Sequence, residues 1–474
     1  MKVVLINPNT GEKERIESEA AWPPLGLLYL GSVLQLEGHE VRIIDNAGER
    51  LPVDALSGRV KREKPDIVGI SALTPTFRQA IKIAQAIKEK NPDVKLIFGN
   101  YHATFEYKRL LEKYPIVDCV VLGEGERTFP ELIRAFEKEN GIKRIKGIAF
   151  RGKNRVIKTP PREPDQDLDG LPFPDRSLLE WEYHSELVGL LGTAGKFTTV
   201  LSSRGCPYAC RYCACSAFSL RKVRFRSPEN VVAEMEQLYS QGYEEVGFVD
   251  DNLLLNRKRV EKICELLRDR KVKLDLWAEG RVDQASPETL EKLSRAGCRT
   301  IYFGIESASQ KVLDYYGKSI TPEMSRRAVA NAKKAGIENV IGSFIVGAPI
   351  ETREDVRKTF DFALSLREMD FPQMNILNLT PGMELWNLAI REGQLSEENY
   401  WDTAVPAVKA LPSFLNEMEL NEMVNGFYQE FLKRLSYLIS QILKTFKSEY
   451  RLKILLANLR SGRGLKSIKQ LWGG

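Results

Sequence analysis

Short apolar runs alternate with segments of helical periodicity along the first 140 residues. Runs of strand length occupy residues 3–7, 41–45, 67–71, 95–99 and 119–123. Apolar residues recur with helical spacing over residues 25–37, 78–90, 104–114 and 128–138. Continuous apolar strands that alternate with helices are typical of a parallel sheet buried on both faces. The pattern predicts a doubly wound α/β domain over residues 1–140, with its ligand at the carboxyl ends of the strands.

The pattern changes over residues 141–195. Two short apolar runs, 147–150 and 156–158, flank a turn at Lys153 and Asn154 and predict a hairpin. The prolines between Pro160 and Asp175 favour an extended chain rather than a helix. This segment therefore reads as a linker with a hairpin.

A second series of β/α units fills residues 196–390. Its strand-like runs begin near Thr198 and recur at 246–251, 274–278, 300–304, 339–347 and 373–378. Six such strands with helices between them predict a partial (β/α)6 barrel, with the site at the carboxyl ends of the strands. Residues 391–474 read as a helical region, and a chain of 474 residues is long enough for several cores.

Four of the seven cysteines fall within ten residues, just after the first of these strands. Cys206, Cys210 and Cys213 have C-x3-C-x2-C spacing, and Cys215 follows them. Three close thiolates can hold three irons of a [4Fe–4S] cluster and leave the fourth iron open. A zinc site would need a second cysteine pair, and a disulfide framework does not suit a long chain without a signal peptide. Cys215 could be a small buried residue or a modulator, whereas three isolated cysteines read as core residues: Cys119, Cys264 and Cys298.

With the aromatic Tyr212 before its third cysteine, this motif resembles that of the radical S-adenosylmethionine (SAM) superfamily. The resemblance implies that SAM chelates the open iron through its amino and carboxylate groups. It also implies SAM contacts at the strand ends, at Asp250, Asp251, Asn252, Glu279, Arg281, Glu306, Ser307 and Gly347. Carboxylates and amides can accept from the ammonium and ribose hydroxyls of SAM, and arginine can pair with its carboxylate. The alternative is structural, because an aspartate pair often caps a helix and Arg281 could form a surface ion pair.

The first domain resembles the cobalamin-binding domain that is fused to many radical SAM enzymes. The resemblance is carried by residues 22–30, 64–71, 98–104 and 118–126. It implies cobalamin contacts at Ser71, Thr74, Gly99, Tyr101, His102, Thr104, Gly123, Glu124, Gly125 and Glu126. Glycines at strand ends let the backbone approach a large planar ligand.

The loop after the first strand departs from the cobalamin proteins that ligate cobalt through histidine. Their motif is D-x-H-x-x-G, whereas residues 7–11 read Asn-Pro-Asn-Thr-Gly. We therefore expect cobalamin to be bound without a protein imidazole, and His102 to contact the nucleotide tail or simply pack. The alternative is a domain that kept its sheet and lost the cofactor.

Together the two resemblances cover about residues 1–390. They imply a cobalamin-dependent radical SAM enzyme, a C-methyltransferase at an unactivated carbon that uses a [4Fe–4S] cluster, SAM and methylcobalamin. The alternatives are a cobalamin-free radical SAM enzyme that forms C–C bonds or rings in lipid chains, and a non-catalytic iron–sulfur protein. Methylthiolation is disfavoured, because it needs three more N-terminal cysteines and only Cys119 lies there. The substrate could be a peptide or protein, a small molecule or a lipid, and an external electron donor is required.

Composition changes this picture mainly at the end of the chain. The net charge of +6 and the 28% of charged residues suit a soluble protein and give no reason to expect nucleic-acid binding. Reduced cysteines, an oxygen-sensitive cluster and the lack of an apolar run of about 20 residues predict an anaerobic, cytoplasmic protein. Eight basic residues and one acid, Glu449, lie between Lys444 and Lys469.

Within that basic tail, residues 441–459 carry an apolar series of Ile442, Phe446, Leu452, Leu455, Leu456 and Leu459. A basic amphipathic helix with such a series could make a peripheral contact with an anionic membrane, or bind an acidic protein. The alternative is that its apolar stripe packs on the barrel and its charges are solvated.

Overall fold

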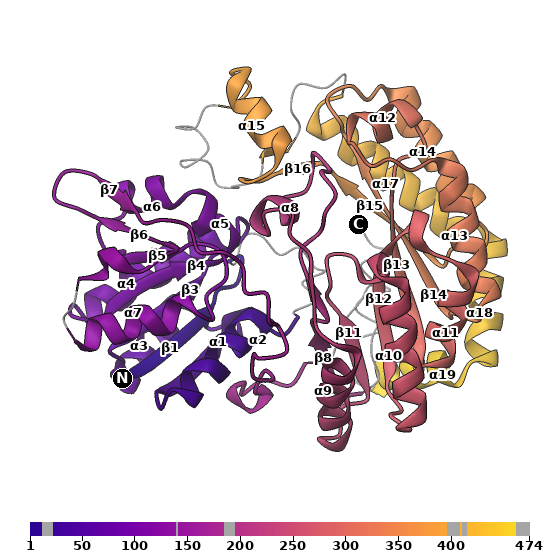
Figure 1. Cartoon of the computed structure of the whole chain (residues 1–474). Helices are drawn as coiled ribbons and strands as arrows, with labels where there is room; N and C mark the ends of the chain where they lie inside the picture. Colours follow the sequence, from indigo (N-terminus) through magenta and orange to yellow (C-terminus); the bar gives the residue numbers. More distant parts are fainter. Residues whose placement is uncertain (12–21, 139–140, 184–194, 396–407, 410–414, 461–474) are drawn as a thin grey trace.

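The computed structural model describes residues 1–11, 22–138, 141–183, 195–395, 408–409 and 415–460 (Figure 1). Its first sheet has the strand order β2-β1-β3-β4-β5-β6-β7. Five strands are parallel: β1 (Lys2–Asn7), β2 (Glu40–Asp45), β3 (Ile67–Ser71), β4 (Lys95–Gly99) and β5 (Cys119–Val121). The strand order reverses beside β1, as in doubly wound folds, whose ligands bind at the carboxyl edge.

Helices cover both faces of this sheet. They are α1 (Leu25–Leu36), α2 (Asn46–Glu49), α3 (Val53–Glu63), α4 (Phe77–Lys90), α5 (Asn100–Phe105), α6 (Tyr107–Lys113) and α7 (Thr128–Glu137), with a 3-10 turn η1 (Ile142–Arg144). The apolar sides of α3 and α4 form one core with the sheet, and those of α1 and α7 form the other. The helix expected over residues 104–114 is two helices that meet at Glu106, and α3 was not predicted.

The predicted hairpin belongs to the first sheet rather than to a separate linker. Its strands, β6 (Ile148–Arg151) and β7 (Val156–Lys158), extend the sheet beyond β5 in antiparallel fashion. Thr159 donates to and accepts from the backbone of Ile148, which ties the start of the extended segment to the sheet. The described part of that segment includes the 3-10 turn η2 (Arg176–Leu178).

The second sheet has the six parallel strands that the sequence predicts. The order is β15-β14-β13-β12-β11-β8, and β8 and β15 lie at its two edges, as in a partial barrel. The strands are β8 (Phe197–Val200), β11 (Glu245–Phe248), β12 (Asp275–Arg281), β13 (Cys298–Glu306), β14 (Asn339–Val346) and β15 (Phe371–Ile376).

Helices α9 (Pro228–Ser240), α10 (Arg257–Asp269), α11 (Pro287–Arg295), α12 (Gln310–Tyr315), α13 (Pro322–Lys334) and α14 (Arg353–Ser365) connect these strands. Three of them begin with the same local sequence, a hydroxyl residue followed by proline and glutamate. Ser227, Ser286 and Thr321 each accept a hydrogen bond from the backbone three residues on, and proline takes the next position. Both features favour a helix start. The minor elements are β9 (Ser203–Arg204), β10 (Arg224–Phe225), α8 (Cys215–Phe218), η4 (Leu253–Leu255) and η5 (Val282–Gln284).

Most of the C-terminal region packs on the barrel, whereas its first helix shares a core with the first sheet. The region comprises β16 (Asn378–Leu379), α15 (Glu384–Arg391), β17 (Val408–Lys409), α17 (Glu417–Lys433), α18 (Leu435–Lys447) and α19 (Glu449–Arg460). The buried Asp370 at the start of β15 accepts hydrogen bonds from Lys333 (2.9 Å), Lys444 (2.9 Å) and Arg451 (2.8 Å). Burial raises the pKa of Asp370, but these cations outweigh that effect and lower it to about 2.

The expected single helix over residues 441–459 is broken at Ser448. Ser448 has an extended backbone, and its hydroxyl contacts Glu338 and accepts from the backbone N–H of Arg451. This contact begins α19, which buries Tyr450, Arg451 and Ile454 against the barrel. No helix within the described ranges is long and apolar enough to cross a membrane.

Candidate functional site

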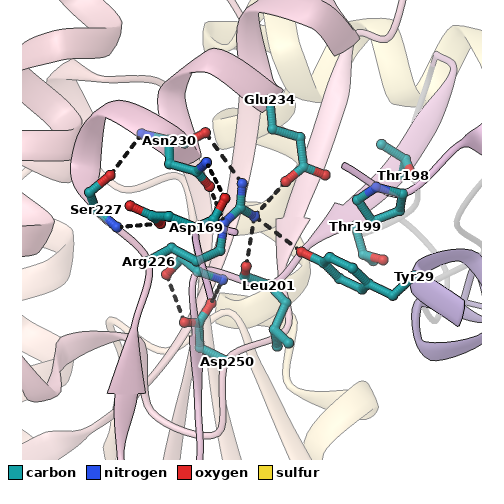
Figure 2. Close-up of polar contacts among 12 residues, drawn as sticks. Tyr29, Asp169, Thr198, Thr199, Leu201, Arg226, Ser227, Asn230, Glu234 and Asp250 are labelled. Atoms are coloured by element: carbon teal, nitrogen blue, oxygen red, sulfur yellow. Dashed lines mark hydrogen bonds and ion pairs between the residues drawn. The ribbon is translucent and has the colours of Figure 1, made fainter. Parts of the chain in front are cut away.

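A buried ion-pair cluster joins helix α1 of the first domain to helix α9 of the barrel (Figure 2). The Arg226 guanidinium contacts Glu234 and donates to the Tyr29 hydroxyl at 3.2 Å and to Asn230 at 2.7 Å. Arg176 from the extended segment forms a second ion pair with Glu234 at 2.6 Å. Tyr29 lies on α1 and Glu234 on α9, so this cluster fixes the first domain against the barrel.

The cysteine loop starts from a position that only glycine can occupy. Gly205 has a φ of +89°, and a Cβ there would lie 2.2 Å from the backbone oxygen of Lys222. Its N–H donates to Asp251 at 3.0 Å, which ties the loop to the end of β11. The local sequence Arg204–Gly205–Cys206 therefore turns the chain so that the three cysteines follow over the carboxyl ends of the barrel strands.

The three motif cysteines are partly exposed on this one loop, and burial raises the pKa of Cys206. Arg281 lies 4.0 Å from the sulfur of Cys210. Burial raises the pKa of Cys210, and the charges of Lys318 and Arg281 oppose that rise. A hydrogen bond from Cys215 lowers the pKa of Cys213 to about 7.

The loop carries three thiol groups within eight residues, from Cys206 to Cys213. Among the described residues, no three histidine, cysteine or acidic side chains converge closely enough to hold one metal ion. A cubane cluster differs because each thiolate binds its own iron. Cys206, Cys210 and Cys213 thus supply the three thiolates that a [4Fe–4S] cluster with one open iron requires.

The residues after β11 mainly make hydrogen bonds with the segment that leads into the cysteine loop and with the residues around it. Asp250 is buried, and it accepts from the Ser202 hydroxyl (2.7 Å), the Ser202 N–H (3.2 Å) and the Ser203 hydroxyl. Asn252 donates to Gln284 at 2.8 Å, while its buried Oδ1 has no donor among the described residues. Gln284 in turn donates to Tyr208. The structure thus gives Asp250 a structural role and leaves Asp251 and Asn252 nearer the loop.

Two cation-centred groups flank the cluster loop. Arg281 lies over the ring of Tyr208 at 3.8 Å, pairs with Asp283 at 3.0 Å and donates to the backbone oxygen of Lys318 at 2.6 Å. The Lys318 ammonium donates to Glu306 at 2.7 Å.

Glu306 also accepts from the Tyr212 hydroxyl at 2.9 Å. Its backbone has a left-handed φ of 65°. A residue other than glycine keeps this conformation only where the surrounding contacts hold it in place. The predicted residues Tyr212, Arg281 and Glu306 are therefore brought together, with Lys318 at their centre.

Three other predicted SAM residues are placed differently. Ser307 is buried and contacts the Thr359 hydroxyl at 3.0 Å. Gly347 has a φ of +93°, and its N–H donates to the buried Glu351, whose pKa burial raises to about 7. The Glu279 side chain is exposed to solvent, although it lies in a densely packed part of the protein. Burial and the charges of Asp250 and Asp251 raise its pKa to about 7.

The carboxyl ends of β3, β4 and β5 form the other half of the site. Ser71 accepts from Asn100 at 2.8 Å, and Thr104 accepts from the Gly123 N–H at 3.0 Å. A Cβ at Gly123, where φ is +78°, would meet no atom within 4 Å. The edge thus presents open backbone at Gly123, which fits the approach of a planar ligand.

His102 is fully buried beside this edge rather than exposed on it. Its ring contacts the Thr74 hydroxyl at 3.1 Å and packs on Phe77 with the ring centres 4.1 Å apart. Burial lowers the pKa of His102 to about 3, so the imidazole is neutral. Neither His102 nor Thr74 is positioned to reach a ligand without rearrangement.

The two halves meet directly. Tyr101 on α5 stacks on Phe218 of α8 with ring centres 4.1 Å apart, and Cys215 lies within hydrogen-bond contact of Tyr101 and Cys213. Glu124, Gly125 and Glu126 follow β5, and both glutamates pair with the cysteine-loop strands. Glu124 pairs with Arg224 at 2.6 Å and Glu126 with Arg204 at 2.7 Å. The carboxyl edge of the first sheet and the cysteine loop therefore share one interface.

Sequence reasoning missed the basic residues that build this interface, and also the lysine that holds Glu306. Arg204 and Arg224 lie on short strands and Lys318 lies in a loop, and no motif marks them. The available signal was indirect: three arginines at positions 221, 224 and 226 lie close after a cysteine motif, opposite an acidic Gly-Glu-Gly-Glu stretch at 123–126.

Two family models match this chain. The radical SAM superfamily model matches residues 200–363, and the B12 binding domain model matches residues 15–133. The chain is 36% identical to an uncharacterised methyltransferase of Pyrococcus horikoshii over 93% of this chain and 95% of that protein. It is 30% identical to the anaerobic magnesium-protoporphyrin IX monomethyl ester cyclase of Rubrivivax gelatinosus, over 98% of this chain and 83% of the cyclase.

Among solved structures, a similar fold is found in the radical SAM methyltransferase TsrM from Kitasatospora setae, whose structure has cobalamin and a [4Fe–4S] cluster bound. The TM-score is 0.69 at 21% identity, over 83% of this chain and 78% of TsrM. At this identity the likeness supports the two-domain fold rather than a shared substrate.

Proposed function

Because this chain belongs to the radical SAM enzymes that carry a B12-binding domain, we propose that it transfers a methyl group from SAM to an unactivated carbon. The cofactors of this family are a [4Fe–4S] cluster, SAM and cobalamin. When bound, they supply the electron, the hydrogen-abstracting group and the methyl carrier of the reaction. The protein contributes binding, orientation and charge.

One observation carries the proposal: the open edge of the first sheet meets the cysteine loop. The stack of Tyr101 on Phe218 and the contact of Tyr101 with Cys215 join the two sites. The residues that would hold cobalamin, at Gly99 and Gly123, lie on the same edge of the sheet as the residues that contact the cysteine loop and its strands. A substrate between that edge and the loop would be within reach of both cofactors, as methyl transfer to a carbon radical requires.

The residues of the barrel would hold the cluster and SAM. Arg281 and Lys318 place two positive charges beside the loop, which offsets the charge of three thiolates. Lys318 also fixes Glu306, and Tyr212 supports the same carboxylate from the loop itself. Glu306 is thus oriented from two sides before any ligand arrives, which lowers the cost of binding.

Cobalamin would be held without a protein imidazole on cobalt. The loop after β1 lacks histidine, and His102 is buried under Thr74 and Phe77. Ser71, Tyr101, Thr104 and the backbone at Gly123 remain the candidates for contacts.

Ring formation is the second candidate reaction. It is favoured by the match to a cyclase over 98% of this chain. A cyclase would use the same cluster and SAM to abstract hydrogen, but it would not move the SAM methyl group. The two reactions are therefore distinguished by whether SAM loses its methyl group.

For either reaction, the reduced cysteines and the oxygen-sensitive cluster favour an anaerobic cytoplasm as the location of the enzyme.

Anaerobic reconstitution tests the cofactor set on which both reactions depend. We expect about four irons per chain and a cobalamin absorbance spectrum that stays with the protein on gel filtration. The triple variant Cys206→Ala, Cys210→Ala, Cys213→Ala should lose the iron and keep the cobalamin, because the first sheet is untouched. Iron retained by that variant, or no cobalamin bound by the wild type, would contradict the proposal.

A further inference from the structure

Helix α18 leaves most of its apolar side chains outside. Its buried residues are Gln441 and Thr445, while Tyr437 and Leu438 are half-buried and Tyr437 packs on the barrel core. Five apolar side chains are exposed: Leu435 (69%), Ile439 (48%), Ile442 (56%), Leu443 (53%) and Phe446 (73%). A helix that merely completes a barrel places its apolar stripe inward. In α18 a second apolar stripe faces outward.

The inner side of α18 is fixed by polar contacts, so the helix cannot rotate to hide its apolar side. Lys444 donates to Asp370 at 2.9 Å, the Tyr437 hydroxyl donates to the Asp370 backbone at 2.9 Å, and Gln441 accepts from Arg451 at 2.7 Å. Turning the helix would leave Asp370 buried without these donors, which is costly. The contacts of the inner side therefore hold the apolar stripe of α18 on the outside of the fold.

The exposed side chains form one continuous stripe. Ile439, Ile442, Leu443 and Phe446 follow spacings of three and four residues, which places them together on one side of a helix. Single exposed apolar residues need no explanation, but a contiguous stripe marks an interaction surface. We call Leu435, Ile439, Ile442, Leu443 and Phe446 the α18 stripe.

The charges around the stripe indicate what it meets. Lys433 and Lys447 are exposed at the two ends of the helix. Ten basic residues, against Glu449 alone, lie between Lys433 and Gly474, and two of them, Lys444 and Arg451, pair with the buried Asp370. A second copy of the chain would bring two such basic segments together, and their repulsion opposes self-association. An anionic surface with an apolar interior complements both the stripe and its rim.

We propose that the α18 stripe docks the enzyme on the surface of an anionic lipid bilayer, with its apolar side chains at the headgroup–acyl boundary and Lys433 and Lys447 among the headgroups. Figure 1 shows α18 on the far side of the barrel from the first sheet. Docking there leaves the interface between the two domains uncovered. The inference does not depend on the reaction that the enzyme catalyses.

Vesicle flotation of the full reconstituted enzyme tests this proposal. Wild type should float with phosphatidylcholine vesicles that contain phosphatidylglycerol, float poorly with phosphatidylcholine alone, and bind less as salt rises. The variant Ile439→Gln, Ile442→Gln, Phe446→Gln should bind at least tenfold more weakly. Its thermal midpoint should be unchanged, because these side chains are exposed.

A matched control replaces three exposed apolar residues on other helices: Leu36→Gln, Tyr239→Gln and Met418→Gln. It should float like wild type. The proposal is overturned if wild type binds no vesicles, or if the stripe variant floats as well as the control. It is also overturned if wild type is a dimer that the stripe variant makes monomeric, or if only poly-glutamate binds through the stripe, which would indicate an acidic protein partner.

Discussion

The Arg224 guanidinium donates two hydrogen bonds, of 2.8 and 2.6 Å, to the carboxylate of Glu124. Glu124 follows the last parallel strand of the first sheet, and Arg224 lies on β10, which pairs with the strand that leads into the cysteine loop. The pair is a paired-fork contact, the strongest geometry for these groups. Through these two side chains, the pair connects the carboxyl edge of the first sheet to the strands beside the cysteine loop.

Replacing Arg224 with methionine should weaken this connection. Arg224 is buried, and removing one partner of a buried ion pair costs about 3 kcal/mol. We expect a lower thermal midpoint and faster loss of cobalamin from the reconstituted protein. Lys222→Met is the control, because its pair with Glu163 is exposed and such pairs contribute about 1 kcal/mol or less. Equal midpoints for the two variants would show that the pair does not couple the domains.

Gly205→Ala should displace the cysteine loop. The new Cβ would lie 2.2 Å from the Lys222 backbone oxygen, at a φ of +89° that alanine rarely adopts. The iron content after reconstitution should fall well below that of wild type. Gly426→Ala on α17 has no atom within 4 Å of its new Cβ and should keep full iron, with stability equal or slightly higher.

Cys215 should be dispensable for the cluster. Its sulfur contacts Cys213 and Tyr101, but the three motif cysteines already supply three ligands. Cys215→Ser should therefore keep the iron content of wild type. Iron loss in this single variant would mean that Cys215, rather than one of the other three, ligates the cluster.

The buried Glu351 should make stability depend on pH. Burial raises its pKa from 4.5 to about 7, so the folded protein holds this proton where the unfolded chain has lost it. The contribution of Glu351 therefore falls as pH rises from about 4.5 to 7. Above pH 7 the cost reaches about 3 kcal/mol.

Glu351→Gln removes this ionisation and keeps an acceptor for Gly347 and Ala348. The stability difference between the variant and wild type should be near zero at pH 5 and favour the variant by pH 8, as measured by denaturant unfolding. Glu354→Gln, an exposed neighbour, should change stability by about 0.5 kcal/mol or less at any pH. A difference that does not vary with pH would show that Glu351 keeps an ordinary pKa.

The positions of the strands in both sheets could be predicted because each strand is a short apolar run with a polar boundary. The six barrel strands and the five parallel strands of the first sheet lie where their runs predict. Helix α3 was missed because Val53–Glu63 is largely polar and exposes most of its surface. The break at Ser448 was missed because it depends on Glu338, which is 110 residues distant in the sequence.

The site was predictable only where residue spacing carries the chemistry. The cysteine motif predicts that Cys206, Cys210 and Cys213 lie on one loop after the first barrel strand, and the structure places them there. Asp250, by contrast, reads as a strand-end carboxylate, and its partners Ser202 and Ser203 are known only from the fold. The orientation of α18 also could not be predicted, because an amphipathic pattern does not tell which side of the helix faces the barrel.

The most direct test of the proposed reaction is whether SAM loses its methyl group only when cobalamin is present. Reconstituted enzyme should be incubated with SAM and a low-potential reductant, with and without cobalamin, and S-adenosylhomocysteine measured by mass spectrometry. We expect S-adenosylhomocysteine to form with cobalamin and not without it, and its formation to persist in the α18 stripe variant. Deoxyadenosine without any cobalamin-dependent S-adenosylhomocysteine would contradict methyl transfer and favour ring formation.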